Sequence, residues 1–141
     1  MKPLYLTQLT CTVFVLLAIA SMASGCARKL DAGTVQRQQS SIESAAREGQ
    51  LVARQVTKDA TLGTTTRVRM EDLTITASGA GDSLSQATAS PQLEHKAHKL
   101  ATIAGDVTDT LNELYRHPAD KSVAHSVDLK LGKLARQAHR A

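Results

Sequence analysis

The chain has little of what a large enzyme or a multi-span membrane protein would need. Of its 141 residues only 2% are aromatic, with no Trp, and it contains three Pro and two Cys. Two cysteines cannot staple a disulfide-rich miniprotein, and the length fits a single domain. With 42% hydrophobic and 21% charged residues, the composition is that of a small globular protein and excludes one that crosses a membrane many times.

One uninterrupted apolar run is present, and it lies near the N-terminus at residues 13–20. Lys2 supplies a positive charge before it, and no residue between Pro3 and Ala27 is charged. Such a run suits a secretory signal peptide, whereas a helix that spans a bilayer needs about 20 apolar residues. We therefore predict that residues 1–25 are a signal peptide that is removed by cleavage.

The run Ala23-Ser24-Gly25-Cys26 resembles the lipobox of bacterial lipoproteins. The resemblance covers the first 26 residues of the chain. It implies that a lipoprotein signal peptidase recognises the three residues before the cysteine and cuts after Gly25. It also implies that the sulfur of Cys26 carries a diacylglycerol. The first lipobox position is usually Leu and is Ala23 here, so ordinary cleavage, giving a freely secreted protein, is the alternative.

Cysteine usage agrees with the lipoprotein interpretation. Cleavage after Gly25 removes Cys11 and leaves Cys26 as the one cysteine, with no partner for a disulfide. A lone thiol is a liability in an oxidising compartment, and acylation would cap it. We therefore expect membrane lipid to be a partner through acylated Cys26, on the extracytoplasmic side of the cell membrane. Arg28 and Lys29 would then lie at the headgroups.

The rest of the chain is predicted to be helical, with a short tether at 26–33 and one domain at 34–141. Ser90 suits an N-cap and Pro91 the first turn of a helix that ends before Pro118. Between them, apolar residues recur at alternating spacings of four and three, which is typical of one helical face. They are Leu93, Ala97, Leu100, Ala104, Val107, Leu111 and Leu114.

Similar stripes predict helices over 34–59 and from about Asp120 to the C-terminus. The block 66–88 is contested, because residues 67–76 also alternate like a strand and Gly79 and Gly81 each weaken a helix by about 1 kcal/mol. A lone hairpin would lack partner strands, so we predict a helix there too.

Four such stripes joined by short connections at 61–65, 89–90 and 117–119 predict an all-α, antiparallel up-down four-helix bundle. The alternative is a looser arrangement of two or three helices in which 66–88 is partly disordered.

Candidate chemistry is sparse. His95 and His98 lie one turn apart on a predicted helix, and two imidazoles at this spacing can begin a metal site. The residues toward the core on that helix are apolar, so both imidazoles are expected to point toward solvent. Glu-x-x-His, P-loop and Gly-x-Ser-x-Gly motifs are absent. We predict no catalytic residue, no metal and no cofactor, with these two histidines as the weak metal candidates.

These observations lead to two hypotheses from different classes. The favoured one is a non-enzymatic envelope lipoprotein that acts through protein or surface contacts, with an envelope protein of unknown identity as a further partner. The alternative is an exported metal- or small-ligand-binding helical module. Nucleic acid is not expected, because the mature net charge is small and Tyr115 is the one aromatic residue left for stacking.

The cations of the last helix have two interpretations. They favour the helix macrodipole, or they contact anionic lipid or an acidic wall polymer. They are Lys121, Lys130, Lys133, Arg136 and Arg140.

Overall fold

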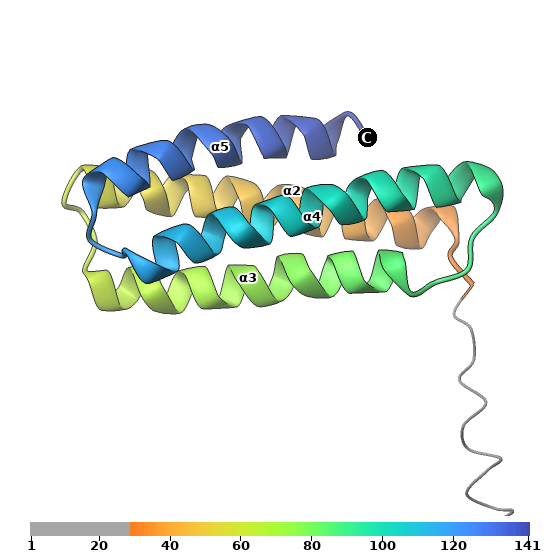
Figure 1. Ribbon diagram of the computed structural model, residues 1–141, viewed down its shortest axis with the longest axis horizontal. Coiled ribbons are helices and arrows are strands. Elements are labelled where there is room, and N and C mark those ends of the chain that lie inside the picture. The colour runs from red at the N-terminus through yellow and green to blue at the C-terminus, as the bar shows by residue number, and fades with distance from the viewer. Residues whose placement is uncertain (1–28) are drawn as a thin grey trace, which may run out of the picture.

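Four helices make up residues 29–141, the part of the chain that the computed structural model describes (Figure 1). They are α2 (Ala32–Thr57), α3 (Gly63–Ser85), α4 (Pro91–Arg116) and α5 (Lys121–His139). Each packs antiparallel against the next, and α5 returns against α2 (Figure 1). The predicted all-α, antiparallel four-helix bundle is confirmed. Within the described residues, no helix combines the length and apolarity needed to cross a bilayer.

The helix boundaries agree with the sequence pattern most closely where the start and stop signals are strongest. α4 begins at Pro91 and ends at Arg116, as predicted. α3 begins and ends three residues earlier than the predicted 66–88 but is continuous, so the partly disordered alternative is wrong. The helix runs through both of its inner glycines: Gly81 is buried against α4, whereas Gly79 is exposed. Packing therefore outweighs the low helix propensity of this segment.

Aspartate side chains cap the starts of α2 and α5. Asp31 accepts a bond from the backbone N–H of Thr34 at 2.6 Å, and Asp120 accepts bonds from the N–H groups of Ser122 and Val123. Each satisfies donors that a helix N-terminus leaves unpaired. Ser90 occupies the N-cap of α4 as predicted, but its side chain makes no capping bond.

The segment predicted as a tether, 26–33, is part of the bundle over its described residues. α2 already begins at Ala32, and Leu30 before it is only 5% exposed. The N–H of Leu30 donates to the carbonyl oxygen of Thr88 at 2.9 Å, which fixes the chain to the α3–α4 connection. The tether is therefore shorter than predicted, because Leu30 belongs to the core. The predicted signal peptide and Cys26 lie outside the described residues.

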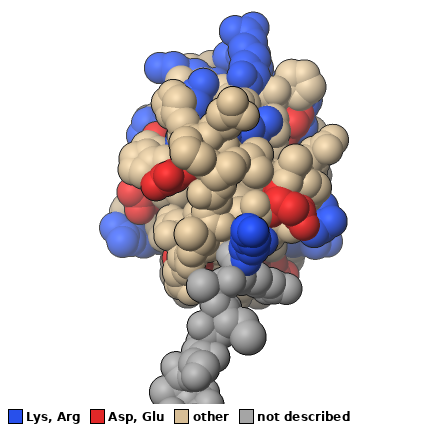
Figure 2. All heavy atoms as spheres, turned by 90° about the vertical axis from the view of Figure 1, so that its right-hand side faces the viewer, with Lys and Arg blue, Asp and Glu red and all other residues tan. Residues whose placement is uncertain are grey.

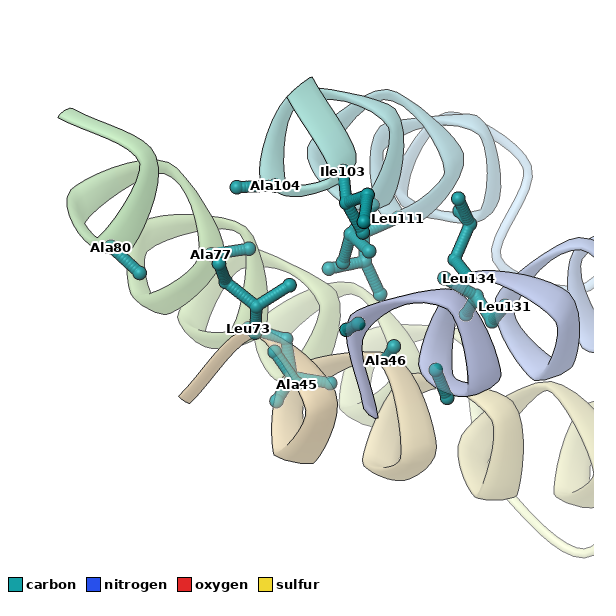
Figure 3. Packing of buried hydrophobic residues seen from close by; sticks show 14 of the residues in the cluster. Ala45, Ala46, Leu73, Ala77, Ala80, Ile103, Ala104, Leu111, Leu131 and Leu134 are labelled. Carbon is teal, nitrogen blue, oxygen red and sulfur yellow. The ribbon is translucent and has the colours of Figure 1, made fainter. Parts of the chain in front are cut away.

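The core consists of small and branched aliphatic side chains from all four helices. Its fully buried large members are Ile42, Met70, Leu100, Leu111, Leu114, Leu131, Val35, Val107 and Val127. Alanines lie where α3 and α4 approach each other, and leucines of α4 and α5 fill the centre (Figure 3). A Cβ at Gly81 would lie 3.1 Å from the Cβ of Ala104, which shows how close α3 and α4 come.

Candidate functional site: the groove between α4 and α5

The position of α5 is set by polar contacts with α2. The Gln39 amide donates to the carbonyl oxygen of Ala138 at 2.7 Å, near the end of α5. Two turns or more away, the Gln50 amide donates to the carbonyl oxygen of Asp128 at 3.2 Å. We call this interface the α2–α5 seam. It consists of the residues that bond across it and the glycines between them: Gln39, Glu43, Gly49, Gln50, Arg54, Asp128, Gly132, Ala138 and His139.

Ion pairs and small residues tighten the same seam. Arg54 lies 3.0 Å from Asp128 across it. A Cβ at Gly49 would lie 2.5 Å from a methyl carbon of Leu111 and 2.9 Å from one of Leu131. Only a residue without a Cβ fits between these two buried leucines, so Gly49 lets α2 pack closely on both α4 and α5.

On its other side, α5 leaves an open groove against the first half of α4. The cavity has a volume of about 590 Å³. It is lined by His95, His98, Lys99, Thr102, Ile103, Asp106, Gln137 and Arg140, and we call it the α4–α5 groove. It continues along the two helices into a further hollow of about 390 Å³, which shares Asp106 and Gln137 with it and adds Lys130 and Lys133.

The groove has an apolar floor and a polar, mainly cationic rim. Ile103 is only 6% exposed and belongs to the core, whereas His95, His98, Lys99 and Arg140 are exposed. In the described part of the chain, neither Lys99 nor Arg140 makes an ion pair. The lining therefore offers two permanent cations and two imidazoles against one carboxylate, that of Asp106. Donors of this kind bind anions such as phosphate and carboxylate.

The two histidines lie where the sequence predicts, on the exposed surface of α4. The structure adds that both line one cavity with residues more than 35 positions away in the sequence. No group of three or more His, Cys, Asp or Glu side chains within residues 29–141 is arranged to hold a metal ion. The residues that sequence reasoning did not connect to the histidines are Lys99 on the same helix and Arg140 on α5.

Resolved pKa shifts occur outside this groove. Burial acts to raise the pKa of Glu43, but bonds from Arg47 and His139 outweigh it and hold the pKa below its ordinary value. The pKa of Asp31 is lowered because the backbone N–H and the hydroxyl of Thr34 both bond to its carboxylate. Both carboxylates thus serve helix packing and capping.

The cations of α5 divide into paired and unpaired groups. Lys121 forms an ion pair with Asp59 at 2.5 Å, and Lys130 forms one with Glu113 at 2.7 Å. Lys133, Arg136 and Arg140 make no ion pair with the described residues. The unpaired cations therefore gather toward the C-terminal end of α5. Figure 2 looks onto this end, and Lys and Arg side chains are most numerous at its top, where α5 lies.

Among the other residues singled out in the sequence, Tyr115 lies in the described part of the chain, whereas the predicted lipidation and cleavage positions do not. Tyr115 is half-buried, with the guanidinium of Arg67 5.7 Å from its ring centre, an arrangement typical of a cation–π contact. Cys26 and the cleavage-site residues Ala23, Ser24 and Gly25 lie outside the described residues.

In comparisons with known proteins, no protein-family model, no curated protein and no solved structure matches the chain.

Proposed function

We propose that this protein is a non-enzymatic lipoprotein of the bacterial cell envelope, held at the extracytoplasmic surface of the membrane by acylated Cys26. The observation that carries the proposal is the run Ala23-Ser24-Gly25-Cys26 directly after a short uncharged apolar segment. A signal peptide of this form directs export, and the cysteine at the cleavage site receives the lipid. Two or more acyl chains hold a protein stably, whereas one binds reversibly.

The fold supports an anchor at this position. Leu30 is fixed to the α3–α4 connection, and only three residues lie between it and Cys26, so that the two are four residue steps apart. An extended chain covers at most about 3.6 Å per residue, so the leash is no longer than about 14 Å. An acylated Cys26 would therefore keep this end of the bundle at the membrane surface, where the protein acts by contact with lipid or with another envelope protein.

Replacing the thiol tests the anchor. Cys26→Ser, produced with its own signal peptide in a bacterial host that processes lipoproteins, is expected to leave the membrane fraction and to lose the mass of the acyl chains. Cys11→Ser is the matched control, because it changes the other cysteine within the segment that cleavage removes. It should fractionate as the wild type does. A Cys26→Ser protein that stays in the membrane pellet at its usual size contradicts the proposal.

The alternative function is an exported module that binds a small ligand. The observation in its favour is the α4–α5 groove, whose exposed cations suit a small anion better than a metal ion. Equilibrium titration of the mature chain with Zn²⁺ and with inorganic phosphate distinguishes a metal-binding module from an anion-binding one. Zn²⁺ binding that is lost in His95→Ala/His98→Ala would support a metal site, and identical weak binding in both proteins would remove it.

A further inference from the structure

We propose that the α4–α5 groove binds the phosphate of an anionic phospholipid in the membrane that carries the anchor, and thereby fixes how the bundle stands on that membrane. The proposal rests on the proposed function, because the lipid anchor is what brings the groove to the membrane. It adds a second, non-covalent contact with the lipid surface.

The groove lies toward the end of the bundle that the anchor would hold. The start of α2, the α3–α4 connection and the C-terminus of α5 all lie at the same end of the bundle (Figure 1). This is the end to which Leu30 is fixed, at most about 14 Å of chain from Cys26. His95 and His98 lie in the first turns of α4, and Arg140 follows the last turn of α5. The groove therefore lies in the half of the bundle that the anchor would hold near the headgroups.

The groove carries positive charges that the described residues do not neutralise by ion pairs. Within residues 29–141, several cations toward the far end of the bundle are neutralised by carboxylates, as in the pairs Arg54–Asp128 and Lys121–Asp59. Lys99 and Arg140 have no such partner, although both line the groove. Their charges are therefore available to a ligand, and an anionic membrane surface supplies the complementary charge.

The side chains that line the groove match the chemistry of a phosphodiester. A guanidinium such as that of Arg140 can donate two parallel hydrogen bonds to phosphate oxygens, and an ammonium such as that of Lys99 adds a point charge. The imidazoles of His95 and His98 supply further N–H donors. The apolar floor at Ile103 can pack against the glycerol carbons next to the phosphate. A phospholipid headgroup uses all of these features, whereas a metal ion uses none of the cations.

Vesicle binding by a chain without acyl groups tests this contact separately from the anchor. All buried core residues lie between Leu30 and Ala138, so the mature chain from residue 26 with Cys26→Ser contains the whole core. It is mixed with vesicles of phosphatidylglycerol and phosphatidylcholine, or of phosphatidylcholine alone, and the bound fraction is measured by co-sedimentation. We expect binding to the anionic vesicles that weakens as salt is added.

The discriminating variant is Lys99→Gln/Arg140→Gln. Each cation near an anionic surface accounts for about a five-fold change in binding, so the pair is expected to weaken binding about 25-fold. The matched control is Lys58→Gln/Arg116→Gln, which removes the same charge from the other end of helices about 39 Å long. These residues are also exposed and make no ion pair with the described residues, and binding should change by less than about two-fold.

Four results would overturn the proposal. Equal loss in both double variants would mean that net charge alone causes binding, and unchanged binding in Lys99→Gln/Arg140→Gln would place the contact elsewhere. Equal binding to neutral vesicles would exclude the anionic headgroup. Binding of inorganic phosphate by a chain that does not bind the anionic vesicles would assign the groove to a free anion. Circular dichroism of each variant confirms that the helices are intact, and acylation of Cys26 is tested independently by its mass.

Discussion

α5 has two neighbours, and it contacts them in different ways. Toward α2 it forms the α2–α5 seam, where Gln39, Gln50 and Arg54 all reach α5 across the interface. Toward α4, the one cross-helix ion pair among residues 29–141 is Lys130–Glu113, which lies in the half nearer the connecting loop. Beyond it the two helices leave the α4–α5 groove between them.

The α4–α5 groove follows from the closer packing of α5 on α2 than on the first half of α4. Gly49 and Gly132 carry no Cβ, and a Cβ at Gly132 would lie 2.6 Å from the Gln50 amide nitrogen. Close approach and directional hydrogen bonds therefore draw α5 toward α2. In the first half of α4, long polar side chains such as Lys99 face α5 instead of small ones, so that the helices cannot close.

The largest effect is expected from adding a side chain at Gly49, where α2 packs on both α4 and α5. Gly49→Val places a branched side chain against Leu111 and Leu131, both fully buried. Overpacking of this kind costs about 1–3 kcal/mol, and we expect about 2 kcal/mol of lost stability in urea unfolding. Gly105→Ala is the control, because nothing lies within 4 Å of its Cβ. It should gain up to about 1 kcal/mol from helix propensity. Equal changes in the free energy of unfolding for Gly49→Val and Gly105→Ala would mean that the helices are not tightly packed around Gly49.

Gln39→Ala removes the bond that holds the last turn of α5 to α2. The carbonyl of Ala138 also accepts from the backbone N–H of Ala141 at 3.3 Å, so that it keeps a partner, and losing the shorter Gln39 bond is expected to cost about 1 kcal/mol. The effect should be local, and amide hydrogen exchange should rise in the last turn of α5 more than in its first turn. Uniform exchange along α5 would show that the seam holds the helix equally without this contact.

Arg54→Gln tests whether the exposed ion pair with Asp128 adds to the seam. Such a pair contributes about 0.5 kcal/mol, because solvent and salt screen it. The difference in urea midpoint between wild type and variant should shrink as the ionic strength increases. A difference that does not depend on salt would assign the effect to packing of the Arg54 side chain.

The smallest effect is the pH dependence that comes from Glu43. Its pKa in the folded protein lies below the ordinary 4.5, so the stabilisation is complete above pH 4.5 and is lost as pH falls through the folded value. Glu43→Gln should therefore flatten the acid side of the stability profile. Glu71→Gln, at an exposed residue without an ion pair among those described, should leave it unchanged. Identical profiles for both variants would contradict the role of Glu43.

The sequence predicted the bundle because apolar residues recur at helical spacing in four blocks, although only some of these blocks have clear ends. For α4, Pro91 and Pro118 placed the two boundaries, and the apolar stripe between them placed His95 and His98 on the exposed side. The start of α2 was predicted two residues late, because Leu30 and Ala32 lie among polar residues in what resembled a linker. Only the bond from the N–H of Leu30 to Thr88 and the burial of the Leu30 side chain show that this segment belongs to the fold.

The groove could not be predicted from the sequence, because it depends on how far α4 and α5 diverge. Periodicity identifies the face that each helix buries, but it does not say which neighbour a helix packs against more closely. Gly81 shows the same limitation. It was read as weakening a helix, and it instead permits α3 to approach α4. Arg140 and His95, 45 positions apart in the sequence, meet only in the folded chain.

The intact mass of the mature protein, extracted from membranes of cells that express the full chain, tests the membrane anchor most directly. We predict a chain that begins at residue 26 and is heavier than its sequence by a diacylglycerol or more. A mature chain with the same first residue and an unmodified thiol would contradict the lipoprotein assignment, and the protein would then be a freely secreted bundle.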